Sequence, residues 1–319
     1  MQTICELFNI LLFTTMIGSL LALSALLAGR VLGMPLPLWF GVCCAAAFVL
    51  PLHVPQVWLI PQEEHGWVDF YYVLCAVWAT GIAILALLRL VRCALGLHAL
   101  RSYDACREES ILSCCHDCAR LVGLRKMPIL LWGGLRDPAC VYGLARPAVL
   151  LRKDVAEQLS EKELMAVLCH ELAHVRRRHM LLDCVFDWIC IVNWFNPFVW
   201  LIKREFTACL ETDCDRFALS ALRGHIDRQD YAQTLLRLYS LTQIRRTALG
   251  MGALDFLLAR RRIQLILKRQ KDWVEPVRFA LCGIMLAMAV LFSLWASRAH
   301  FYPYPALQGH MEFSAESIP

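Results

Sequence analysis

Four long stretches without a charged side chain constrain this 319-residue chain more than any other feature of its sequence. A helix needs about 20 consecutive apolar residues to cross the hydrocarbon core of a bilayer. The uncharged stretches hold 23, 32, 19 and 19 residues. We therefore predict four transmembrane helices, at about residues 7–28, 35–58, 69–89 and 278–297.

The composition supports a membrane protein and excludes several other classes. Hydrophobic residues make up 59% of the chain and charged residues 18%, whereas an ordinary soluble domain has about 45–50% and about 25%. Such a hydropathy excludes an intrinsically disordered or low-complexity protein. The segment before the first apolar run has no Lys or Arg, so we interpret it as a retained helix rather than a cleaved signal peptide.

The distribution of charge predicts the orientation in the membrane. Of the 32 Lys and Arg residues, 29 lie between Arg89 and Asp272, while the loop from Pro51 to Asp69 carries acidic residues only. Because basic segments stay in the cytoplasm, we expect residues 90–277 to form a cytoplasmic domain. The N-terminus and the tail, residues 298–319, are expected outside.

The cysteines are expected to be free thiols. Eleven of the 16 fall between Cys93 and Cys214, in the block assigned to the reducing cytoplasm. Cys115 and Cys118 have the spacing of half a zinc knuckle, but no second pair completes such a site. We interpret them as small buried apolar side chains.

The central block contains signals for several elements. Residues 97–122 are expected to form a helix that continues from the third span, residues 127–132 a strand, and residues 139–151 a hairpin. Ser160 and Glu163 form a capping-box sequence, which predicts a helix from there to about His179.

A second helix is predicted to begin within a short uncharged stretch, residues 188–202. This stretch is too short and too polar to span a membrane, and we expect it to lie against the membrane surface or under the transmembrane bundle. Asn196 before Pro197 is typical of a helix start. The helix that it opens should reach about Leu222.

The first of these two helices carries the sequence His170-Glu171-Leu172-Ala173-His174. Residues four apart lie on one face of a helix, so His170 and His174 can converge on one Zn²⁺ while Glu171 reaches a metal-bound water as a general base. The pattern also arises by chance in amphipathic helices. The alternative to a metal site is therefore two histidines that are exposed to solvent, or two core histidines whose ring nitrogens are hydrogen-bonded within the protein.

Two carboxylates on the second helix favour the metal interpretation. Glu211 can provide the third ligand of a catalytic zinc site, and Asp215 can hydrogen-bond a ligand imidazole. Taken alone, both would more often be solvated surface charges. His179 lies five residues beyond His174, so we expect a surface histidine rather than a fourth ligand.

The chain resembles the BlaR/MecR family of membrane zinc peptidases. The resemblance rests on residues 166–178 around the two histidines, on Asn193-Trp194-Phe195-Asn196-Pro197, on Glu211-Thr212-Asp213-Cys214-Asp215, and on the strand segment of residues 143–151. It implies a four-span α-helical membrane protein with a cytoplasmic α+β, gluzincin-like zinc peptidase domain in a bacterial cell membrane. It also implies that His170, His174 and Glu211 bind zinc, that Glu171 is the catalytic base and that Asp215 supports a ligand.

The resemblance implies a cytoplasmic winged-helix repressor as the protein substrate, in signal-dependent derepression. The family's beta-lactam sensors continue into a penicillin-binding domain after the fourth span, which we expect this polypeptide to lack. A separate sensor protein and a homodimer are left open. The alternatives are a quality-control metalloprotease like the HtpX group and a non-catalytic transducer that keeps a metal for structure.

An edge strand beside the zinc helix binds the substrate in peptidases of this type. Our candidate is the strand Ala148, Val149, Leu150 and Leu151, and an interior strand is the equal alternative. We expect no direct binding of nucleic acid, because the cations are scattered and often paired with acids. The cluster Arg260, Arg261 and Arg262, with Lys268, Arg269 and Lys271, is interpreted as an anchor to anionic lipid, and also as a site of self-cleavage.

Overall fold

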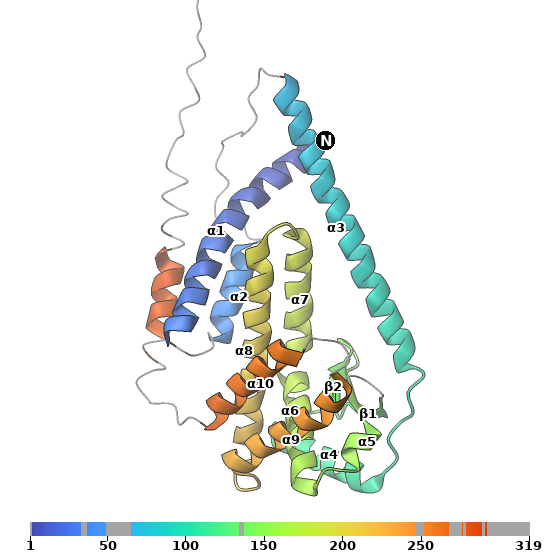
Figure 1. Ribbon diagram of the computed structural model, residues 1–319. Helices are drawn as coiled ribbons and strands as arrows, with labels where there is room; N and C mark the ends of the chain where they lie inside the picture. The colour runs from blue at the N-terminus through green and yellow to red at the C-terminus, as the bar shows by residue number, and fades with distance from the viewer. Residues whose placement is uncertain are drawn as a thin grey trace, which may run out of the picture.

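The protein is mostly helical and contains one small mixed sheet (Figure 1). The computed structural model describes residues 2–32, 37–48, 65–133, 137–246, 252–267, 276, 279–288 and 291. The labelled helices are α1 (Gln2–Leu32), α2 (Leu38–Ala47), α3 (His65–Leu100), α4 (Glu109–Val122), α5 (Lys153–Ala156), α6 (Glu161–Arg177), α7 (His179–Val192), α8 (Pro197–Ala221), α9 (Arg228–Arg246) and α10 (Gly252–Leu267). The strands are β1 (Ile129–Trp132), β2 (Ala139–Tyr142) and β3 (Ala148–Leu151).

One described helix, α3, is long and apolar enough to cross a membrane, through its part Tyr72–Leu100. Many of its large apolar side chains are exposed, among them Val77, Leu87 and Leu95. Shorter apolar helices cover Thr14–Leu27, Leu38–Ala47 and Phe279–Met288. Four spans therefore stay a prediction. Residues 49–64, in and after the second predicted span, and the tail 298–319 lie outside the described residues.

The helical structure is interrupted between α3 and α4, where the sequence predicted one helix over residues 97–122. Helix α3 ends at Leu100 and α4 begins at Glu109. Between them Ala105 forms an antiparallel bridge with Leu131 of β1, and the Cys106 amide donates to the Leu130 carbonyl at 2.9 Å. The prediction of one continuous helix was therefore wrong, because the backbone of this segment hydrogen-bonds to β1 at the edge of the sheet instead of continuing a helix.

The sheet has the order β1-β3-β2. The predicted hairpin is confirmed, since β2 pairs antiparallel with β3, and β1 joins the other side of β3 in parallel. Strand β3, residues 148–151, is thus the central strand and is buried along its whole length. The edge-strand assignment for this segment was wrong, and the interior alternative holds. The outer edge of β2 pairs with no other described strand.

The two helices that carry the predicted metal ligands begin where the sequence predicted. The Ser160 hydroxyl accepts from the Glu163 amide, and the Glu163 carboxylate accepts from the Ser160 amide at 2.8 Å, which completes a capping box. Helix α6 ends at Arg177, and Arg178, at φ 56°, turns the chain into α7. The Asn196 side chain caps α8, with Pro197 as its first residue.

Helix α8 passes through two separate hydrophobic cores. Its first half packs with α1, α2 and α7 through Val199, Ile202 and Phe206. Its second half packs in the core around the sheet, α4 and α6, through Ala218 and Leu222. Figure 1 shows α8 running beside α7 from the level of α1 and α2 down to α6. One rigid helix therefore joins the apolar helices to the domain that contains the histidines.

The turn between α7 and α8 is held against α1 and α3 by polar contacts. Asn193 is buried and accepts from the Thr15 hydroxyl at 2.5 Å, while Asn196 donates to the Ser19 hydroxyl at 2.8 Å. The Trp194 indole donates to the Trp78 carbonyl at 3.3 Å. Residues 188–202 therefore pack against the apolar helices α1 and α3. This agrees with the expectation that the stretch lies under the predicted transmembrane bundle.

Candidate metal centre

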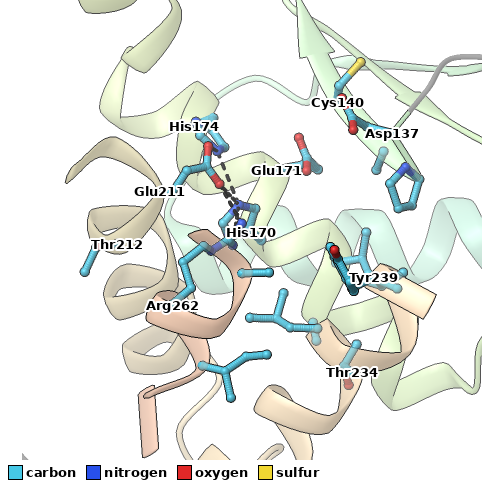
Figure 2. Close-up of a pocket in the computed structure, with 18 of the residues that line it drawn as sticks. Asp137, Cys140, His170, Glu171, His174, Glu211, Thr212, Thr234, Tyr239 and Arg262 are labelled. Atoms are coloured by element: carbon cyan, nitrogen blue, oxygen red, sulfur yellow. Dashed lines mark hydrogen bonds and ion pairs between the residues drawn. The ribbon is translucent and has the colours of Figure 1, made fainter. Parts of the chain in front are cut away.

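The two histidines of the HExxH sequence lie on one face of α6 and point at the same place (Figure 2). The Nε2 atoms of His170 and His174 are 3.3 Å apart. His170 is buried, and His174 is partly buried beside it. Because α6 places residues four apart above one another, its backbone alone brings these two nitrogens together.

Glu211 reaches the same place from α8. Its Oε2 lies 3.4 Å from His170 Nε2, and its Oε1 lies 3.5 Å from His174 Nε2. Two ligands that each lie about 2.0–2.1 Å from a tetrahedral zinc ion are about 3.3–3.4 Å apart. The two nitrogens and the carboxylate therefore fit one zinc ion, and together they form one of the described residue groups that could hold a metal.

Asp215 lies one turn beyond Glu211 on α8 and contacts the rear of His170. Its Oδ1 is 3.0 Å from His170 Nδ1. The Tyr231 hydroxyl of α9 donates to Asp215 Oδ1 at 3.1 Å and lies 3.3 Å from His170 Nδ1. A carboxylate in this place fixes the ring orientation and leaves Nε2 as the metal-binding nitrogen. Asp215 thus lies where it can hydrogen-bond the His170 ring.

Arg262 of α10 also lies in the site, which the sequence did not predict. Its guanidinium is 2.9 Å from Glu211 Oε2, and it contacts both oxygens of Asp215 at 2.8 and 2.9 Å. The interpretation of Arg262 as a lipid anchor was wrong, because α10 folds back over α8 and carries this side chain inward. Arg261 pairs with Glu205 at 3.0 Å, and Arg260 is exposed. Lys268, Arg269 and Lys271 lie outside the described residues.

Glu171 points away from the ligand face and toward a cleft. Figure 2 shows its carboxylate between the histidine pair and the β2 side, where Asp137 and Cys140 lie. Burial raises the pKa of Glu171 to about 7. A carboxylate with a raised pKa in a cleft is a candidate for proton transfer.

The cleft itself has a volume of about 720 Å³ and reaches from β2 to α9 and α10. Ala139, Cys140 and Val141 of β2 line one side, and Leu235, Leu238 and Ile263 line the other. His170, Glu171, His174 and Glu211 lie between these two sides. One side of the cleft is thus formed by β2, whose outer edge pairs with no other described strand.

The charges of the metal-free ligands follow from their neighbours. Burial and the nearby His170 lower the pKa of His174 to about 3, so its ring is neutral. Burial acts against ionisation of Glu211, but Arg262 and His170 outweigh it and lower the pKa of this carboxyl to about 2. Burial likewise opposes protonation of His170, yet Asp215 and Glu211 raise its pKa to about 10. A metal ion would therefore release a proton from His170 on binding.

His179 does not lie on the surface, and that prediction was wrong. The side chain is buried, with Nδ1 3.2 Å from Cys214 Sγ and Nε2 3.2 Å from Asp213 Oδ2. The left-handed turn at Arg178 redirects the chain, so the helical spacing from His174 no longer applies. Cys115 and Cys118, which we interpreted from the sequence as small buried side chains, are buried.

Sequence reasoning missed two residues of the site, Tyr231 and Arg262. Tyr231 sits in a polar helix with no motif around it. Arg262 stands in a run of three arginines, where a cation-rich membrane flank was the simpler interpretation. Only the tertiary packing of α9 and α10 over α8 brings these two residues to the metal ligands.

Comparison with known proteins places this architecture in a family. The family described as BlaR1 peptidase M56 matches residues 57–266. Regulatory protein BlaR1 of Bacillus licheniformis is 29% identical over 197 residues, which cover 62% of this chain and 32% of that protein. Methicillin resistance mecR1 protein of Staphylococcus aureus strain Mu50 is 23% identical over 174 residues, covering 52% of this chain and 28% of that protein. The matches thus span about a third of the length of these curated relatives.

Proposed function

Since this chain belongs to the BlaR1 peptidase M56 family, we propose that it is a membrane zinc endopeptidase with His170, His174 and Glu211 as the metal ligands. The single observation that carries the proposal is the convergence of two imidazole nitrogens and one carboxylate at 3.3–3.5 Å. Three protein ligands and an open position are typical of a catalytic rather than a structural zinc site.

The chemistry requires a zinc ion and a proton carrier. A zinc ion in this site would polarise the scissile carbonyl and make an attacking water more acidic. Glu171 accepts the proton of that water and later donates it to the leaving amine nitrogen. Asp215 and Tyr231 hold the His170 ring in the orientation that points Nε2 toward the metal.

The substrate binds along β2 in this account. Ala139 to Val141 line the cleft, and the outer edge of β2 offers backbone groups to an extended peptide. Strand addition uses main-chain hydrogen bonds and is therefore largely indifferent to substrate sequence. We therefore assign substrate binding to the edge strand of residues 139–142 instead of residues 148–151.

The proposed substrate is a cytoplasmic winged-helix repressor, and its cleavage relieves repression. The proposed topology has four spans, with residues 90–277 in the cytoplasm and both termini outside a bacterial cell membrane. The concentration of basic residues in that block supports this orientation. The names of the relatives, a regulatory protein and a resistance protein, are consistent with a signalling role.

Two alternatives use the same residues differently. A quality-control protease like the HtpX group would share the chemistry but accept unfolded membrane proteins. A non-catalytic transducer would need the metal ligands only. Glu171 stands in the cleft and makes no bond to the ligand set, which favours a catalytic function over a purely structural metal.

Metal analysis of the purified full-length protein in detergent tests the ligand set. We expect about one zinc per chain in the wild type and a large loss in Glu211→Gln. Glu205→Gln is the matched control, because Glu205 lies on the same helix and pairs with Arg261 instead. Wild-type protein without zinc, or Glu211→Gln with the full amount, would overturn the ligand assignment.

A further inference from the structure

A second group of soft metal-binding atoms lies behind the proposed catalytic set. One ring nitrogen of His174, one of His179 and the sulfur of Cys214 all lie within 4.8 Å of one another. His179 and Cys214 are buried, and the His174 and His179 rings meet edge to face with centroids 5.2 Å apart. The proposed hydrolysis uses neither His179 nor Cys214.

A carboxylate and a thiol flank the two ring nitrogens of His179. Asp213 Oδ2 lies 3.2 Å from His179 Nε2, on the side of the ring opposite Nδ1. Arg177 fixes that carboxylate with two hydrogen bonds, of 2.7 and 2.6 Å. A histidine that ligates a metal usually has such a carboxylate beside its other ring nitrogen, and Asp213 lies close to Nε2 although Nε2 makes no hydrogen bond in the structure. This leaves Nδ1 to face the Cys214 sulfur at 3.2 Å.

We propose that His174, His179 and Cys214 form a second metal site, which shares His174 with the catalytic set and selects thiophilic cations such as Zn²⁺, Cd²⁺ and Co²⁺. A thiolate and imidazoles prefer such metals over Mg²⁺ or Ca²⁺. On binding, the S–H bond of Cys214 breaks, a sulfur–metal bond forms, and one proton leaves to solvent. The shared ligand makes the two sites compete for His174.

Cobalt titration of the full-length protein in detergent tests this site, because Co²⁺ bound to a thiolate gives a near-ultraviolet charge-transfer band. In the zinc-stripped protein, we expect excess Co²⁺ to produce the band in the wild type. Cys214→Ser and His179→Gln should lose the band. Cys93→Ser, which changes a partly exposed thiol on α3, is the matched control and should keep it.

The variant Glu211→Gln separates this proposal from the proposed function. It weakens the catalytic set and leaves the second set intact, so the band should appear at a lower Co²⁺ concentration than in the wild type. A wild-type protein that binds one zinc but, once stripped of zinc, develops no band with excess Co²⁺ would overturn the second site alone. So would a band of equal size in wild type and Cys214→Ser. Zinc that is retained in Glu211→Gln and lost in Cys214→Ser would sink the catalytic assignment and keep this one.

Discussion

At the scale of single residues, Asp215 is the side chain that prepares His170 for a metal. It is buried, it lies 3.0 Å from Nδ1, and it is also held by Tyr231 and Arg262. Removing such a supporting carboxylate typically lowers metal affinity about 10–100-fold. We expect this loss in Asp215→Asn, measured by competition with a chromogenic zinc chelator. Asp117→Asn, an exposed change on α4, should keep wild-type affinity, and equal affinity in both variants would contradict the assigned role.

Arg262 balances the charge of the metal-free site. Its guanidinium lies against Glu211 and Asp215, and its side chain is 23% exposed. Removing one partner of a buried ion pair costs about 3–5 kcal/mol, and we expect less here because of that exposure. A bound zinc ion would supply positive charge to the same carboxylates. Arg262→Gln should therefore lower the melting temperature more without zinc than with it, and equal losses in both states would contradict this role.

The residues of the site divide into those that the sequence predicts and those that it does not. His170, Glu171 and His174 follow from helical spacing within five residues. Glu211 and Asp215 required the assumption that a second helix packs beside the first, which the structure confirms. Arg262 belongs to α10 and reaches the site only through tertiary packing, which no local pattern reveals.

At the scale of elements, the capping box at the start of α6 stabilises the helix that carries both histidines. Replacing an N-cap serine by alanine costs about 1 kcal/mol. Ser160→Ala should therefore lower the free energy of unfolding by about this amount at pH 7, measured by chemical denaturation. Ser113→Ala, an exposed change inside α4, should have little effect. Equal stability of Ser160→Ala and the wild type would contradict the contribution of this cap.

The contribution of this cap should depend on pH. Burial acts to raise the pKa of Glu163, but the bonds with Ser160 and Arg237 outweigh it and hold this pKa below the ordinary value of 4.5. A carboxyl with a lowered folded-state pKa stabilises the protein above its unfolded pKa, and this stability is lost as the pH falls through the folded value. The difference between Ser160→Ala and the wild type should therefore be full above the ordinary pKa of 4.5 and shrink as the pH falls below it. A constant difference would contradict the role of the ionised Glu163.

The elements that rest on local signals were predicted well, and those that rest on distant pairing were not. The caps of α6 and α8 and the β2–β3 hairpin each depend on a few neighbouring residues. The central position of β3 depends on its parallel pairing with β1. The break after Leu100 depends on the bridge from Ala105 to Leu131. Both are contacts between separate segments, which periodicity does not report.

At the scale of the whole molecule, α8 connects the apolar helices to the metal ligands. Phe206 packs with α2, and Glu211 follows little more than one turn later on the same helix. Arg89 of α3 also pairs with Asp187 of α7 at 2.6 Å. A movement of the apolar helices would therefore reach Glu211 through a rigid element rather than through a loop.

The proposed orientation can be measured by protease protection. We expect residues 90–277 to resist external protease in right-side-out spheroplasts, because the basic block lies on the cytoplasmic side. The same block should be cleaved in inverted vesicles, where that side faces the protease. An antibody against a peptide of this block would report both results. Cleavage in intact spheroplasts would contradict the orientation.

Whether this chain is a zinc peptidase is tested by the rate at which the zinc-loaded protein cleaves a purified winged-helix repressor encoded beside its gene. We expect cleavage by the wild type and a loss of about 10²–10⁴-fold in Glu171→Gln, with equal zinc content in the two proteins. Cleavage by Glu171→Gln at the wild-type rate would contradict the assignment of Glu171 as the proton carrier of a zinc peptidase.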